Sequence, residues 1–126
     1  MSEKILKYLY DIKLAIEEID LFFIDQEKRF DTYRNNTLLK RAIERNLEII
    51  GEAVNRILVV QADFPLQNAR KIVGLRNQII HSYDNISDEN IWGILINHLP
   101  SLKEEIEELI RWIVFYKACN NDFFPA

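Results

Sequence analysis

The sequence predicts an all-α protein, an up-and-down bundle of four to five helices. Only three glycines and three prolines occur in 126 residues, too few for the many turns of an all-β protein. Apolar residues recur at steps of three and four along several segments, which is the period of an amphipathic helix. None of these segments shows the strict apolar–polar alternation of a half-buried strand. The length fits a single domain over residues 1–126.

The first half of the chain predicts two long helices. The first covers residues 2–26, with an apolar stripe that includes Ile5, Leu9 and Ile12. Residues 26–36 are polar and aperiodic, with room for one short helical turn. Thr37 is a suitable N-cap for a second helix over 38–61. Gly51 in its middle costs about 1 kcal/mol relative to alanine, which indicates a close approach of another helix.

The second half predicts three shorter helices and a tail. Pro65 interrupts the helical pattern, and a further helix is predicted over 68–81. Ser87 is a suitable N-cap for the next helix, and Pro100 either ends that helix or kinks it into a last helix over 101–118. The tail contains Phe123 and Phe124, which either fold back onto the bundle or dock on another subunit.

The net charge of −4 argues against a protein that coats nucleic acid through its overall field. Residues 64–83 are an exception, because they contain no acidic residue and include Arg70, Lys71 and Arg76. This local positive charge lies on the predicted helix over 68–81. We therefore expect Arg70 and Lys71 to contact RNA phosphates.

Other kinds of site are disfavoured. Cys119 is the single cysteine, which excludes an internal disulfide and a multi-cysteine metal site. A zinc site built on the two histidines, His81 and His98, would need carboxylate ligands as well. We expect neither a bound metal nor a cofactor. The sequence contains no signal-peptide pattern and no apolar run long enough to span a membrane, so we expect a cytoplasmic protein.

Arg76, Asn77, His81 and Tyr83 gather at the end of the predicted helix over 68–81 and in the turn after it. This set is poorly suited to a core but well suited to a phosphodiester. Cleavage of RNA by its own 2′-hydroxyl needs a base, an acid and positive charge near the phosphorane. His81 transfers protons near neutral pH, Arg76 stabilises the charge through two parallel donors, and Asn77 supports them. Such a site needs no metal.

Helical geometry separates the two catalytic candidates. Arg76 and His81 lie about 140° apart around a regular helix. Either the helix loosens before His81, or two subunits each contribute residues to one site across a two-fold axis. The second is favoured, because acid–base catalysis works best with two groups. The alternative is that His81 only caps the helix C-terminus as a cation.

Arg45 and Glu52 are a further candidate pair. Seven residues separate them, which places them about 20° apart across two helical turns. They either form a buried polar pair under the site or are ordinary residues of a solvated helix face.

The segment RNQIIHSY, residues 76–83, resembles the R-x4-H-x-Y pattern of HepT-like toxins, with Arg76, His81 and Tyr83 in the three fixed places. Asn77 matches the polar residue that often follows the arginine in the wider HEPN ribonuclease superfamily. The segment RNLEIIGEAVNRI, residues 45–57, resembles the second helix of that family, with IGEA at 50–53. The order of elements is similar along nearly the whole chain.

The resemblance implies a homodimeric HEPN-like bundle that acts as a metal-independent endoribonuclease toxin, with its cleft at the dimer interface and tRNA as the expected substrate. It also implies a type VII-like toxin–antitoxin pair with a minimal nucleotidyltransferase antitoxin, MntA. That partner uses ATP to attach AMP to the tyrosine of H-x-Y, here Tyr83. An AMP group two residues from His81 would block RNA by its bulk and its charge.

Two alternatives to a toxin stay open from the sequence. The chain is then either a helical module without activity that binds the nucleotidyltransferase, or a scaffold with a nucleotide pocket. The complete set of Arg76, His81 and Tyr83 favours the ribonuclease.

Overall fold

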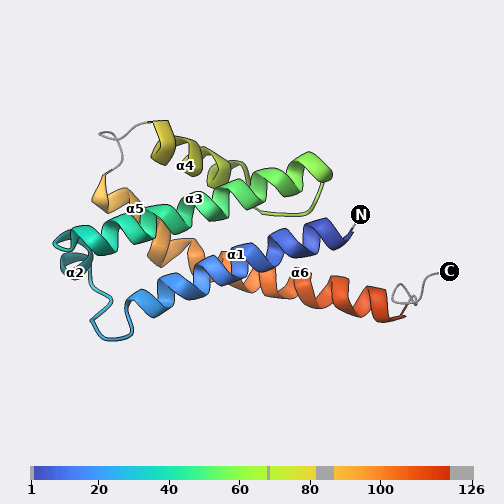
Figure 1. The fold of residues 1–126 in the computed structure, drawn as a ribbon, viewed down its shortest axis with the longest axis horizontal. Helices are drawn as coiled ribbons and strands as arrows, with labels where there is room; N and C mark the ends of the chain where they lie inside the picture. Colours follow the sequence, from blue (N-terminus) through green and yellow to red (C-terminus); the bar gives the residue numbers. More distant parts are fainter. Residues whose placement is uncertain (1, 68, 82–86, 120–126) are drawn as a thin grey trace.

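The computed structural model describes residues 2–67, 69–81 and 87–119. Within these ranges the chain forms six helices and no strand, so the all-α prediction is confirmed (Figure 1). The helices are α1 (Ser2–Phe22), α2 (Phe30–Arg34), α3 (Thr37–Val60), α4 (Ala69–His81), α5 (Asp88–Asn97) and α6 (Leu99–Cys119). None of the described helices is long and apolar enough to cross a membrane.

The three long helices form the core of the bundle. α1 packs against both α3 and α6, while the short α2 and α5 close one end of the bundle against α3 and α6 respectively. Their contact surfaces consist of aliphatic side chains such as Ile12, Ile43 and Ile106, which are fully buried. Gly51, expected at a close helix approach, is also buried.

Two side-chain groups stand out in this core. The Asn46 Nδ2 atom of α3 donates hydrogen bonds to the Ala15 carbonyl oxygen at 3.0 Å and to Glu18 Oε1 at 2.9 Å, which ties α3 to α1. At the closed end of the bundle, Tyr33 packs against Trp92 with ring centroids 5.7 Å apart. The Tyr33 side chain is fully buried.

Helix α4 is placed differently from the others. Among the described helices it contacts α3 alone, and Figure 1 shows α3 lying between α4 and α1. Ala69 and Leu75 are buried, and Ile72 and Val73 pack half-buried against the core. This helix therefore packs on the core, but it lies at the edge of the bundle.

Several predicted boundaries need correction. α1 ends at Phe22, four residues early, because the chain turns there and the Gln26 Nε2 atom donates to the Phe22 carbonyl at 2.7 Å. The N-cap of α3 is Asn36 rather than Thr37, since its Oδ1 atom accepts from the Leu39 N–H at 3.0 Å.

The later boundaries agree better with the sequence. The short turn of helix expected within residues 26–36 is α2. Ser87 caps α5 as predicted, accepting from the Asn90 N–H at 3.1 Å. Helix α5 ends at Asn97, with His98 as its C-cap, so Pro100 lies in the first turn of α6. A missing N–H is tolerated at this position. Phe123 and Phe124 lie outside the described residues.

Candidate functional site

The helix that carries the predicted catalytic residues is regular. α4 is α-helical from Ala69 to His81, so the explanation that it loosens before His81 is wrong. Positions 76 and 81 therefore stay about 140° apart around its axis. The structure describes only the backbone at Arg76 and His81, and Tyr83 lies outside the described residues.

The two positions fall on different stripes of α4. Position 76 shares a stripe with Ala69 and Ile72, which are buried and half-buried respectively. Position 81 continues the stripe of Arg70, Gly74 and Asn77, all of which are exposed. One copy of the helix therefore does not present both positions to the same side.

The exposed stripe borders a groove between α3 and α4, with a volume of about 760 Å³. This lies within the range of about 300–1,000 Å³ that is typical of ligand sites. Three residues predicted from the sequence line the groove together, namely Arg70, Lys71 and Asn77. The remaining lining residues are Asn55, Leu58, Ala62, Phe64, Leu66, Ala69, Val73 and Gly74.

The charge of the groove is positive. Arg70 and Lys71 are exposed, and neither forms an ion pair with any residue in the described part of the chain. Most other described cations do form one, as Lys13 does with Glu17 at 2.9 Å. No acidic side chain is present among the described residues that line the groove. Its two cations are therefore available to an anionic ligand.

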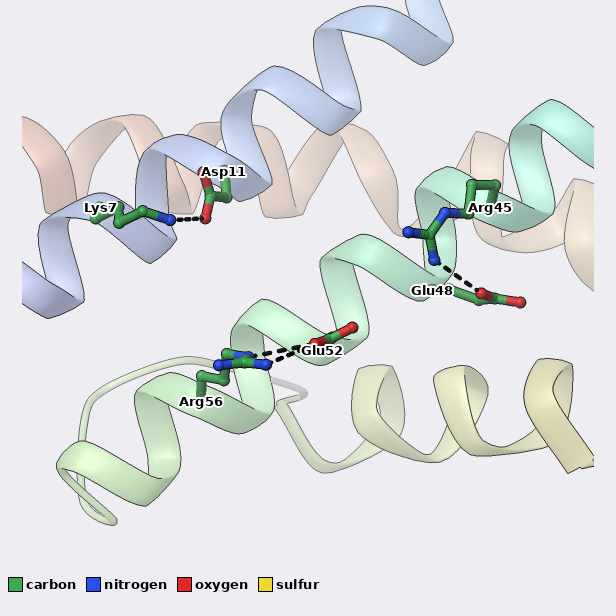
Figure 2. A network of polar contacts seen from close by, with 6 residues as sticks. All are labelled: Lys7, Asp11, Arg45, Glu48, Glu52 and Arg56. Atoms are coloured by element: carbon green, nitrogen blue, oxygen red, sulfur yellow. Dashed lines mark hydrogen bonds and ion pairs between the residues drawn. The ribbon is translucent and has the colours of Figure 1, made fainter.

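Of the two alternatives for Arg45 and Glu52, the buried pair is wrong. Figure 2 shows Arg45 directed to Glu48, with Nη1 and Oε2 3.2 Å apart, and Glu52 directed to Arg56, with Oε1 and Nη2 2.9 Å apart. The side chains of Arg45 and Glu52 are 65% and 48% exposed. Each ion prefers a partner three or four residues away on the same helix, so the alternative of a solvated helix face is correct.

The remaining metal-ligand candidates lie apart from one another. The described residues contain no group of three or more histidine, cysteine, aspartate or glutamate side chains that could hold a metal ion. Cys119 is a free, exposed thiol at the end of α6, and His98 is exposed between α5 and α6.

The groove residues that were not predicted from the sequence include Gly74 and Asn55. Gly74 stands one helical turn from Arg70 and one from Asn77, so an i, i+4, i+7 pattern was present as a signal. Asn55 lies on the neighbouring helix, and only the packing of α4 on α3 brings it to the groove.

Comparison with known proteins identifies the family. The profile of the family described as Ribonuclease HepT-like matches residues 12–109. The chain is 34% identical over 106 residues to a probable ribonuclease HepT of Thermococcus cleftensis, which covers 81% of this chain and 92% of that protein. No solved structure matches the chain significantly.

Two candidate RNases of Methanocaldococcus jannaschii are also similar to the chain. One is 31% identical over 105 residues, covering 82% of this chain and 89% of that protein. The other is 35% identical over 109 residues, covering 85% of this chain and 98% of that protein. The chain therefore belongs to the HepT-like ribonuclease family and is a ribonuclease.

Proposed function

We propose that the chain is the toxin of a toxin–antitoxin pair and cleaves RNA without a metal ion, with Arg76 and His81 as catalytic residues. The family match carries this proposal, because it covers residues 12–109 and so includes both residues and Tyr83. Arg70 and Lys71, which form no ion pair with a described residue, support it, because they supply sites for RNA phosphates in the groove beside α4. We expect tRNA to be the substrate.

The proposed reaction is an attack of the RNA 2′-hydroxyl on the adjacent phosphorus. A neutral histidine takes the proton of that hydroxyl, and a protonated histidine gives a proton to the leaving 5′-oxygen. The guanidinium of Arg76 donates to the non-bridging oxygens, where the negative charge of the phosphorane gathers. The products are a 2′,3′-cyclic phosphate and a free 5′-hydroxyl.

A homodimer would bring position 76 of one copy and position 81 of the other to the same site. Because these positions lie about 140° apart, one copy does not direct both to one phosphate. Two copies across a two-fold axis supply two histidines and two arginines. The exposure of α4 at the edge of the bundle leaves room for this arrangement.

We propose that the antitoxin inactivates the toxin by modifying Tyr83. A minimal nucleotidyltransferase of the MntA type would bind ATP, and the Tyr83 hydroxyl would attack the α-phosphorus. A bond from the tyrosine oxygen to phosphorus forms, and pyrophosphate leaves. The AMP group then adds bulk and negative charge two residues from His81, where the RNA phosphate has to bind.

The catalytic proposal is tested with purified chain, tRNA and an unstructured RNA in excess EDTA. Wild type should cleave, and Arg76→Ala and His81→Ala should lose about 100-fold or more of the rate. His98→Ala is the matched control, because it removes an exposed histidine outside the groove. If EDTA abolishes cleavage, or if wild type and both variants leave the RNA equally intact, the catalytic proposal fails. In the second case an inactive module that binds the nucleotidyltransferase becomes the better description.

The control proposal is tested by intact-mass spectrometry after incubation with the partner and ATP. Wild type should gain one or more AMP units, while Tyr83→Phe should stay unmodified and keep much of its cleavage activity. Tyr10→Phe, at a tyrosine that is 42% exposed, controls for the loss of any accessible phenol. An AMP adduct on Tyr83→Phe would contradict the assignment.

A further inference from the structure

Gly74 has no structural reason to be glycine in the described part of the chain. It lies in the interior of α4, where glycine costs the helix stability relative to alanine. A Cβ atom built on Gly74 would meet no atom within 4 Å. A side chain is therefore absent at a place where the fold leaves open space for one.

The open space at Gly74 is part of the groove. Gly74 lies between Arg70 and Asn77 on the exposed stripe of α4, and these three positions span about 10 Å along the helix. Phe64 and Leu58, both half-buried, line the same groove and give it an apolar wall. The groove thus combines an apolar wall, a bare stretch of helix backbone, and polar groups beside them.

We propose that Gly74 forms the floor of a nucleobase subsite for single-stranded RNA. One unpaired base lies against the α4 backbone at Gly74 and the apolar wall, and its flanking phosphates bind Arg70 and Lys71. The Asn77 amide, which lines the same groove, forms hydrogen bonds with the base edge. The strand follows the stripe toward position 81, about 10 Å further along the helix.

The subsite selects single strands over duplexes. Bases of a duplex are stacked and paired, and A-form RNA presents backbone and a shallow minor groove to proteins. Only a base released from its stack enters a groove beside a helix. This inference rests on the proposed ribonuclease function, and it names the form of RNA that the site accepts.

Charge decides between RNA and a second copy of the chain as the occupant of this groove. An isologous contact brings the same patch of both copies together. Arg70 and Lys71 of one copy would then approach those of the other, and no carboxylate among the described groove residues would offset their charge. An RNA strand instead supplies the missing negative charge.

The test fills the groove by Gly74→Leu and, more gently, by Gly74→Ala. Gly93→Ala is the matched control, because Gly93 is also helical and its Cβ would meet only Asn97 Nδ2 at an ordinary 4.0 Å. Binding is measured by fluorescence anisotropy with a labelled 2′-O-methyl oligonucleotide, which has no free 2′-hydroxyl to attack. The same oligonucleotide annealed to its complement serves as the duplex probe. Cleavage of unmodified RNA, thermal stability and oligomeric state are measured in parallel.

Wild type should bind the single strand at least about tenfold more tightly than the duplex, and Gly74→Leu should lose about tenfold in single-strand affinity. Gly74→Ala should lose less, and both variants should keep the thermal stability and oligomeric state of wild type or improve on the stability. Gly93→Ala should bind like wild type. Wild-type affinity in Gly74→Leu, or a change in its oligomeric state, would overturn the subsite. If wild type binds the single strand as expected but cleaves no RNA, the ribonuclease proposal fails while the subsite stands.

Discussion

Replacing Tyr33 by phenylalanine should stabilise the protein. The Tyr33 side chain is fully buried, and its hydroxyl has no hydrogen-bond partner among the described residues. The aromatic ring packs against Trp92, and phenylalanine keeps this ring. The substitution therefore removes a buried polar group and leaves the packing in place.

The size of the effect follows from the cost of the unsatisfied hydroxyl, about 1–3 kcal/mol. Removing it should raise the free energy of unfolding by at least about 1 kcal/mol. For a chain of 126 residues, 1 kcal/mol corresponds to a rise of about 4 °C in Tm.

The effect should grow at alkaline pH. Burial, reinforced by the negative charge of Asp88, raises the pKa of the Tyr33 phenol above its usual value. A raised folded-state pKa contributes stability that is complete below the unfolded pKa of about 10 and is lost as the pH rises beyond it. Wild type should therefore lose up to about 1.4 kcal/mol per pH unit above pH 10 from this group, a loss that Tyr33→Phe avoids.

The assay is calorimetry or urea unfolding at pH 7 and at about pH 11. Tyr10→Phe serves as the control, because its phenol is 42% exposed and its removal should change the Tm little. A lower Tm for Tyr33→Phe at pH 7 would show that the hydroxyl has a stabilising partner, which would refute the reasoning.

Four other substitutions have expected outcomes. Asn46→Asp puts a second carboxylate about 3 Å from the Glu18 carboxylate of α1, which accepts a hydrogen bond from Asn46 Nδ2 in wild type. The free energy of unfolding should fall by several kcal/mol at pH 7 and recover in part near pH 4. A loss in urea unfolding that does not depend on pH would contradict this. Asn36→Ala removes the α3 cap and should cost about 1 kcal/mol, and an unchanged urea midpoint would mean that the cap contributes nothing. Arg70→Gln and Lys71→Gln should each reduce, by about 0.7, the slope of the logarithm of the single-strand binding constant against the logarithm of the salt concentration. Arg111→Gln, which removes an exposed cation of α6, should leave this slope unchanged.

Local chemistry made the helices and one of the caps predictable. A helix's apolar stripe and the N-cap at Ser87 depend on residues within a few positions of each other, and both are confirmed. The cap of α3 was misplaced because Asn36 and Thr37 are adjacent and both suit the role. Only the backbone conformation at the helix start decides between such neighbours.

Burial at the candidate site depends on more than the spacing of residues along one helix. The spacing of Arg45 and Glu52 gives their relative direction on α3 but not their burial, and partners within one turn compete for each charge. The i, i+4, i+7 spacing of Arg70, Gly74 and Asn77 places Gly74 on their stripe, but the exposure of that stripe depends on α4 contacting α3 alone among the described helices. Burial and exposure at the edge of a bundle arise from contacts between distant segments.

The one-sided attachment of α4 has a consequence for local stability. A helix held by a single neighbour opens at a lower free energy than helices enclosed on several sides. The backbone amides of α4 should therefore exchange with solvent before those of α1, α3 and α6. A partner, a modification or a bound RNA strand that acts on α4 can thus order or loosen this helix while the rest of the bundle stays folded.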